Sequence, residues 1–130
     1  MDESGMSLKD KIVDQSLKLF TLKGFFGTSM QDILEAGQCS KGGFYNHFSS
    51  KEDLFFAVAS RARSHWRERN LHGLERIDSP MEKVGRFLRN YRDRYLADKD
   101  SLPGGCPFLM LAVELADQRP HLARELNEGF

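Results

Sequence analysis

Apolar residues recur at helical spacing along almost the whole chain, and this periodicity decides the fold class. In the first run, Val13, Leu17 and Phe20 stand at positions i, i+4 and i+7 of one face. No segment alternates apolar and polar residues as a half-buried strand does. Glycine and proline fall between the helical runs, where they end one helix and open the next. The sequence therefore predicts an all-α protein.

Capping residues divide the first half of the chain into four helices. Gly24 stands where a left-handed cap would end the first helix. Thr28 or Ser29 is expected to cap a short second helix, and Ser40 an equally short third one. A longer fourth helix is expected to begin after Ser50 and to touch both halves of the protein. Its predicted buried side carries Leu54, Phe55, Val58, Ala62 and Trp66.

Three proline-led runs predict further helices in the second half. Proline is favoured in the first turn of a helix, and Pro80, Pro107 and Pro120 each stand before a helical pattern. The segment Phe108 to Ala116 is apolar nearly all round, which is typical of a helix buried on every side. The stripe predicted on the helix that follows Pro80 comprises Val84, Leu88, Tyr91 and Tyr95.

Composition limits where the protein can act and which chemistry it can perform. The longest apolar run is far shorter than the roughly 20 residues that cross a bilayer, and Met1–Gly5 lacks the start of a signal peptide. We therefore expect a cytoplasmic protein with no membrane partner. Cys39 and Cys106 do not form a CxxC pair and are expected to be free thiols. The formal net charge is zero, so a case for DNA binding must depend on local charge.

The segment Thr28 to Lys51 best indicates a function. Its two short helices are joined by a tight turn, and the second carries small and polar residues on its outer side. Gly42 and Gly43 cost roughly 1 kcal/mol each relative to alanine in a helix, and close approach to a DNA groove is one reason to tolerate them. Lys41 can reach a phosphate or a guanine edge. The candidate DNA contacts are Thr28, Ser29, Gln38, Ser40, Lys41, Gly42, Gly43, Tyr45, Asn46, His47 and Lys51.

Several short motifs between Phe20 and Phe55 stand at a specific joint spacing. They are Leu19-Phe20, Lys23-Gly24-Phe25, Gly27-Thr28-Ser29, Asp32-Ile33, Ser40-Lys41-Gly42, Phe44-Tyr45-Asn46-His47-Phe48 and Ser50-Lys51-Glu52-Asp53-Leu54. Together they resemble the tetracycline-repressor (TetR) family of regulators. The resemblance implies a homodimer on a palindromic double-stranded operator. The third helix of each subunit would lie in the major groove, with half-sites roughly 34 Å apart. A small molecule bound in the second domain would release the DNA.

The chain departs from the family pattern in two places. The family usually has Gly-Val between the two reading helices, where this chain has Gln38-Cys39. Either Gly37 or Gln38 must then take the left-handed turn position, and we expect Cys39 to fill the apolar site. The family also continues through further helices. We therefore expect a helix-turn-helix domain over residues 1–50, and over residues 51–130 a connecting helix with an effector-binding and dimerisation domain that looks truncated.

Aromatic side chains of the second half could line an effector pocket, or could equally be plain core. Glu114 is the one charge in an apolar helix, so it should either pair with an arginine or face the pocket. Cys106 precedes a predicted helix start, where thiol pKa values are lowered, and its surroundings resemble a thiol-sensing TetR branch. The candidate effector-binding residues are Trp66, Phe87, Tyr91, Tyr95, Cys106, Phe108 and Glu114.

These observations predict a sequence-specific DNA-binding transcriptional regulator, a repressor released from its operator by a small-molecule effector. Two alternatives stay open: a thiol-based sensor that acts through Cys106, and a helical protein-interaction module. An enzyme is not supported, because the sequence offers no nucleophile–base pair, metal cluster or phosphate loop. We expect no catalytic residue, metal or cofactor.

Overall fold

The computed structural model describes residues 6–128, and all the regular structure within them is helical, as the sequence predicts. Met1–Gly5, on which the expectation about a signal peptide depends, lies outside the described residues. The elements in chain order are α1 (Leu8–Lys23), α2 (Met30–Gly37), α3 (Lys41–Tyr45), α4 (Lys51–Asn70), the 3-10 turn η1 (Leu74–Arg76), α5 (Pro80–Asn90), the π-helical turn η2 (Tyr91–Leu96), α6 (Pro107–Leu115) and α7 (Pro120–Asn127).

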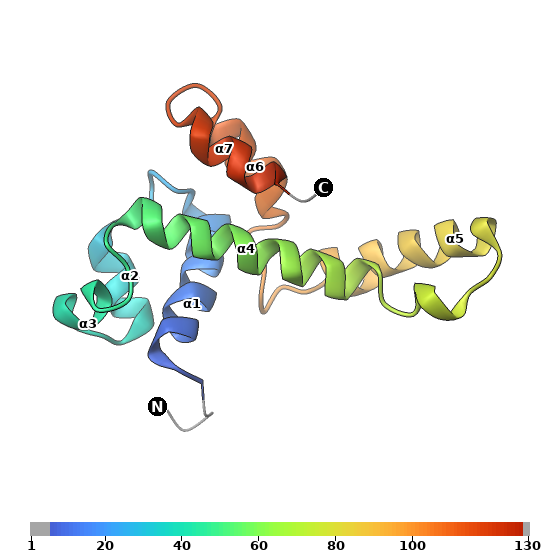
Figure 1. The fold of residues 1–130 in the computed structure, drawn as a ribbon, viewed down its shortest axis with the longest axis horizontal. Coiled ribbons are helices and arrows are strands. Elements are labelled where there is room, and N and C mark those ends of the chain that lie inside the picture. Colours follow the sequence, from blue (N-terminus) through green and yellow to red (C-terminus); the bar gives the residue numbers. More distant parts are fainter. Residues whose placement is uncertain (1–5, 129–130) are drawn as a thin grey trace.

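Helix α4 runs along the molecule and joins its parts (Figure 1). Helices α1, α2 and α3 gather around the N-terminal half of α4, whereas α5 lies at the opposite end. Helices α6 and α7 pack against each other, and the pair contacts both α1 and α4. The sequence expectation that the fourth helix touches both halves is confirmed. The division at residue 50 stays a prediction, because the first turns of α4 belong to the same hydrophobic core as α1.

The predicted serine caps fix where the short helices begin. Ser29 Oγ accepts the Asp32 N–H at 3.0 Å, and the Asp32 carboxylate accepts the Ser29 N–H at 2.9 Å, which completes a capping box. Ser40 and Ser50 cap α3 and α4, each accepting the N–H three residues further on at 3.0 Å. Gly24 closes α1 with a positive φ of 79°. These caps satisfy N–H and C=O groups that a helix end leaves without partners.

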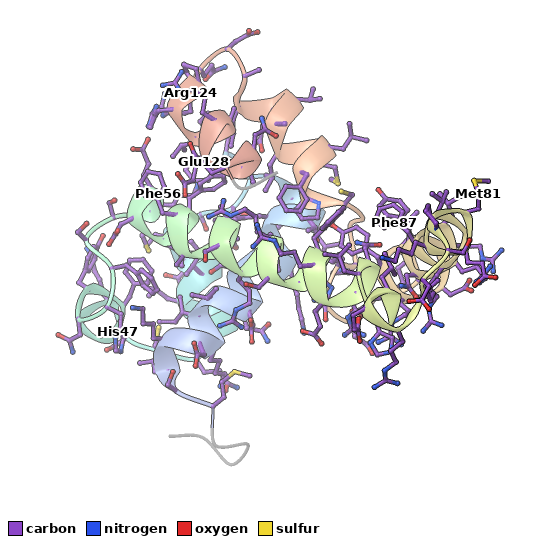
Figure 2. All side chains as sticks on the ribbon, turned by 45° about the vertical axis from the view of Figure 1, so that its right-hand side comes forward. His47, Phe56, Met81, Phe87, Arg124 and Glu128 are labelled. Carbon is purple, nitrogen blue, oxygen red and sulfur yellow. The ribbon has the colours of Figure 1, made fainter. Side chains whose placement is uncertain are left out.

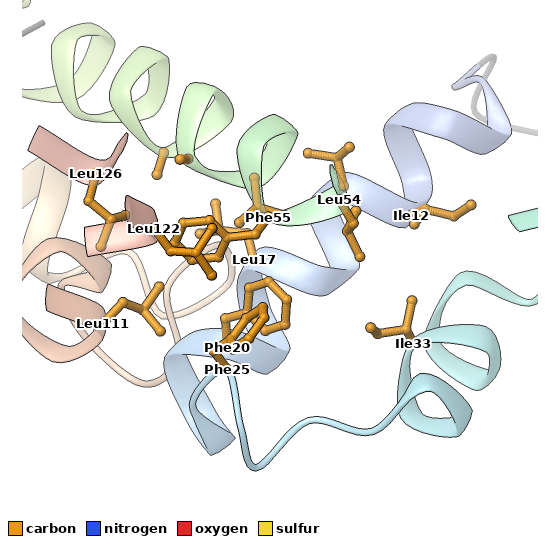
Figure 3. Packing of buried hydrophobic residues seen from close by; sticks show 14 of the residues in the cluster. Ile12, Leu17, Phe20, Phe25, Ile33, Leu54, Phe55, Leu111, Leu122 and Leu126 are labelled. Carbon is orange, nitrogen blue, oxygen red and sulfur yellow. The ribbon is translucent and has the colours of Figure 1, made fainter. Parts of the chain in front are cut away.

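Aromatic rings connect α1, the following loop and α4 in the hydrophobic core. The Phe25 ring centroid lies 5.6 Å from that of Phe20 and 5.5 Å from that of Phe55, in edge-to-face arrangements. Leucines of α6 and α7, including Leu111 and Leu122, approach the same cluster (Figure 3). Replacing a fully buried phenylalanine of this kind by alanine typically costs about 3–5 kcal/mol, so the cluster is a major source of stability.

Two surfaces that the sequence predicts to be buried are exposed. Leu109 and Val113 of α6 are 70% and 74% exposed, so this helix buries one side and not all sides. On α5, Val84 and Leu88 are 53% and 60% exposed, although Tyr95 of the same predicted stripe is fully buried. The predicted stripe does not continue from α5 into the tyrosines, because η2 is π-helical. The wider turn changes the angle between successive residues, and the tyrosines leave the face that the α-helical residues define.

A largely buried ionic junction holds α4 to the turn after η2. Asp98 Oδ2 lies 3.4 Å from His65 Nε2 and 3.2 Å from Arg69 Nη2. Burial and the positive charge of Arg69 lower the pKa of His65, and they outweigh the nearby carboxylates, of which Asp98 is the most important. The folded protein therefore disfavours the charged form of this imidazole.

This junction predicts a loss of stability as the pH falls. The unfolded chain takes up a proton on His65 below its usual pKa of about 6.5, whereas the folded chain resists it. Above that pH, His65 is neutral in both states and makes its full contribution to the free energy of unfolding. This contribution decreases as the pH falls toward the lowered pKa. In urea titrations, the stability difference between the wild type and His65→Gln should shrink from about pH 7.5 to about pH 5.5. A difference that is constant over this range would contradict the assignment.

Candidate nucleic-acid interface

Helix α3 is held on the surface by two buried rings. Phe44 is fully buried and Phe48 nearly so, and their ring centroids lie 5.5 Å apart. Figure 2 shows His47 projecting from the end of the molecule opposite Met81. Anchoring one side of a short helix in this way leaves its other side free to meet a partner. The exposed residues of that side are Lys41, Gly42, Tyr45, Asn46 and His47.

In the turn between α2 and α3, the left-handed position is taken by Gln38 and not by Gly37. Gln38 has φ 53° and ψ 48°, and the Lys11 ammonium donates a hydrogen bond to its side-chain oxygen. Gly37 has a different role, because a Cβ there would lie 3.2 Å from a side-chain carbon of Ile12. The glycine thus allows α2 to pack closely on α1. Cys39 packs half-buried against the core, as the sequence predicts.

The two glycines of α3 are there for different reasons. A Cβ on Gly43 would lie 3.3 Å from the capping Ser40 Oγ and 3.6 Å from Leu8, so internal packing accounts for this glycine. A Cβ on Gly42 would meet nothing closer than Ser40 Oγ at 3.9 Å, which is ordinary contact. The interior of the protein therefore does not require glycine at position 42, and close approach by an external partner remains its best explanation.

Two of the candidate DNA contacts point into the protein, which corrects the expectation for their side chains. Thr28 is fully buried, and its hydroxyl donates to the Gly24 carbonyl at 2.7 Å. Lys51 donates to the Phe25 carbonyl, and its Nζ lies 4.2 Å from the centre of the Phe25 ring. Burial lowers the pKa of Lys51. Ser29, Gln38 and Ser40 are exposed, as a contact residue must be.

Glu114 joins α6 to the loop between α1 and α2, a role that the sequence analysis missed. Its carboxylate accepts the backbone N–H groups of Phe25 at 2.7 Å and Phe26 at 2.9 Å. It neither pairs with an arginine nor lines the effector pocket, so both expectations for this residue were wrong. A Cβ on Gly24 would lie 2.8 Å from this carboxylate, so Gly24 also provides the space for it. The available signal was a single charge in an otherwise apolar helix.

Helix α7 and the residue before it add further polar contacts to the same end of the molecule. Arg119 Nε lies 3.2 Å from one oxygen of Glu52 at the start of α4, and His121 Nε2 lies 3.4 Å from the other. The Arg119 guanidinium also lies 5.6 Å from the centre of the Phe26 ring. Helices α6 and α7 are therefore attached to the loop and to the first turn of α4 by side chains far apart in the sequence.

An aromatic pocket of about 390 Å³ lies between α4, η2, α6 and α7. Cys106, half-buried, is the N-cap of α6, and its Sγ lies 3.5 Å from the Tyr95 hydroxyl. Tyr95 is fully buried, and Phe87 packs against two pocket rings without lining the cavity itself. Four of the seven predicted effector residues therefore come together. The lining residues are Trp66, Tyr91, Cys106 and Phe108, with Leu109 and Asn127, which were not predicted.

Comparison with known proteins identifies this arrangement. The family described as "Bacterial regulatory proteins, tetR family" matches residues 12–58, which include α2, the turn and α3. A crystal structure of a TetR transcriptional regulator from Chloroflexus aurantiacus J-10-fl is 33% identical, with a TM-score of 0.82 over 97% of this chain and 63% of its own. The chain belongs to the TetR family.

Relatives from two bacteria show how much of a TetR-family protein the chain represents. An uncharacterized HTH-type transcriptional regulator in the lacX 3' region of Lactococcus lactis is 33% identical over 94% of this chain and 62% of its own length. The negative transcriptional regulator IcaR of the biofilm operon icaADBC in Staphylococcus epidermidis is 27% identical over 68% of this chain and 50% of its own. The chain thus spans about three-fifths of the length of the first of these relatives.

None of the helices among residues 6–128 has the length and apolar character needed to cross a membrane. The same part of the chain contains no group of three or more His, Cys, Asp or Glu side chains that could hold a metal ion.

The Glu114 contact predicts a local change in backbone protection. The carboxylate of Glu114 accepts both N–H groups with its two oxygens, whereas the side chain of Glu114→Gln has a single, uncharged acceptor oxygen. Hydrogen bonds to charged groups are worth about 1.5–3 kcal/mol. The Phe25 and Phe26 amides should therefore exchange with solvent about tenfold faster or more, as measured by hydrogen–deuterium exchange. The exposed acidic residue Asp117 gives a matched control, and Asp117→Asn should leave both rates unchanged. Equal protection in Glu114→Gln and wild type would show that the contact does not hold this loop.

Proposed function

We propose that this TetR-family chain is a cytoplasmic, sequence-specific DNA-binding regulator that represses transcription by occupying a palindromic operator as a homodimer. The observation that carries the proposal is the exposed side of α3, held in place by Phe44 and Phe48 from behind. A short helix fixed in this manner can enter a major groove, where base edges present distinct patterns of donors and acceptors.

The chemistry of the α3 surface suits DNA although the whole chain carries no net charge. Residues 40–51 contain two lysines, Lys41 and Lys51, and no aspartate or glutamate. Lys41 is the exposed one of the two. Lys41 can reach a phosphate or a guanine edge, and Asn46 can pair with an adenine. Tyr45 and His47 suit phosphate oxygens. The proposed contacts are Ser29, Gln38, Ser40, Lys41, Gly42, Gly43, Tyr45, Asn46 and His47.

We propose that α6 transmits binding of a small molecule to the reading helices. Phe108 and Leu109 at the start of α6 line the aromatic pocket, and Glu114 further along α6 holds the N–H groups of Phe25 and Phe26. A ligand that moves α6 must therefore carry the loop before α2 with it or break these hydrogen bonds. Either change alters how α3 is presented, and coupling free energies of this kind are typically about 1–3 kcal/mol.

Selection from random duplexes tests the proposal, because the protein itself then picks out the sequence that it binds. Binding of the full chain should enrich a palindrome, and Lys41→Ala should weaken binding to it by about tenfold or more, since a specific base contact is worth about 1–3 kcal/mol. Gly42→Ala should also weaken binding, although it leaves unfolding by urea unchanged or shifted to higher urea.

Lys83→Ala, on the exposed surface of α5, is the matched control and should bind as the wild type does. Failure to enrich any sequence would instead favour the protein-interaction module. If Lys41→Ala and Gly42→Ala both bind the enriched DNA as tightly as the wild type does, the DNA contact lies elsewhere on the chain.

Thiol sensing through Cys106 is a second candidate for the release signal, because the residue lines the aromatic pocket. Alkylation there would add a group inside the cavity and so act as a covalent effector. Iodoacetamide should then weaken operator binding by the wild type but not by Cys106→Ser. Cys39, the other thiol, is present in both proteins and controls for modification near α3. If mass spectrometry finds Cys106 unmodified in the folded protein, thiol sensing is excluded.

A further inference from the structure

A second cavity, of about 350 Å³, lies between α1, α4 and the turn that follows η2. None of its lining residues also lines the aromatic pocket. We infer that it binds a small zwitterion of the amino-acid class, a molecule that carries one ammonium and one carboxylate group. The lining residues are Met6, Asp14, Gln15, Leu17, Lys18, Arg61, Ser64, His65, Glu68 and Ser101.

Several charges of this cavity are already paired within the protein. Arg61 makes ion pairs with Asp14 and with Asp10, one turn earlier on α1. His65 lies against Asp98 in the junction described above. These contacts join α1 to α4, and they engage Arg61 and Asp14 with partners inside the protein, so neither side chain is free to pair with a ligand.

Lys18 and Glu68 are the charges that remain. Lys18 lies on α1 and Glu68 on α4, so a cation and an anion line the cavity from different helices. Among residues 6–128, no hydrogen bond or ion pair engages either side-chain charge. Gln15, Ser64 and Ser101 add neutral donors and acceptors between them.

This charge pattern selects the class of ligand. A simple anion would suit Lys18 but would face the carboxylate of Glu68, and a simple cation would meet the reverse conflict. A molecule with both charges satisfies both helices at once, and charge-assisted hydrogen bonds are the strongest that such a site can make. The volume is near the lower end of the range of about 300–1,000 Å³ for ligand sites, which fits an amino acid better than a nucleotide.

Such a ligand would bridge α1 and α4. It would hold α1 against α4 from a position separate from the aromatic pocket. Binding itself does not depend on the proposed function in transcription and can be measured without DNA.

Isothermal titration of the full chain with the twenty common amino acids, and with ω-amino acids of increasing length, tests the inference. At least one should bind saturably with one molecule per chain. Its C-terminal amide and its N-acetyl form, which each lack one charge, should bind about tenfold more weakly or worse. If none of the zwitterions binds saturably, the inference is wrong. It is also wrong if the amide and the N-acetyl form bind as tightly as the amino acid.

Two neutral variants assign each end of the ligand to its partner. Lys18→Met should bind the amino acid and its amide equally, since it has lost the partner of the carboxylate. Glu68→Gln should bind the amino acid and its N-acetyl form equally. Lys83→Met and Glu82→Gln on exposed α5 are the controls and should keep the wild-type preferences. If Lys18→Met and Glu68→Gln, folded as judged by urea titration, keep the wild-type preferences, the ligand binds elsewhere and the inference is wrong.

Discussion

The contact between Phe20, Phe25 and Phe55 is the constraint on which the rest of the structure depends. It joins α1, the loop after α1 and the first turns of α4 in one aromatic cluster. Helix α2 begins a few residues after Phe25. Helix α3 follows α2, and Phe44 and Phe48 pack into the same hydrophobic core, so the position of both helices depends on that core. Because interiors are packed as densely as organic crystals, a shift of α4 or of the loop displaces the side chains that pack against this cluster.

Helix α6 connects this aromatic cluster to the aromatic pocket. One end of α6 lines the pocket and the other places Glu114 on the backbone of Phe25 and Phe26. The hydrogen bonds are to N–H groups and not to side chains, so the contact depends on the path of the loop more than on its sequence. The contacts of Arg119 and His121 with Glu52 attach the start of α7 to the same end of the molecule.

Local features were the ones that the sequence predicted correctly. The caps at Ser29, Ser40 and Ser50 and the buried rings of α3 depend on neighbours only a few residues away, so spacing alone identifies them. Gln38 in the left-handed position could not be decided in the same way, because the reason that Gly37 is not used lies in Ile12 of α1. Periodicity also cannot foresee the π-helical turn that moves Tyr91 and Tyr95 off the stripe of α5.

Long-range contacts account for the remaining errors. Glu114 meets a loop almost ninety residues earlier in the chain, and no spacing rule links the two. The apolar residues of α6 indicate a buried helix, but which side is buried depends on α1 and α7. The candidate interface was therefore largely visible in the sequence, whereas its connection to the pocket was visible only in the fold.

The central claim is that the exposed side of α3 meets DNA. A titration of the isotope-labelled protein with a selected duplex, followed by the backbone amide shifts in NMR spectra, tests this claim most directly. We predict that the largest shift changes fall on residues 38–47 and that α5 is unaffected. Changes centred on α5 or on the aromatic pocket, with α3 unaffected, would contradict it.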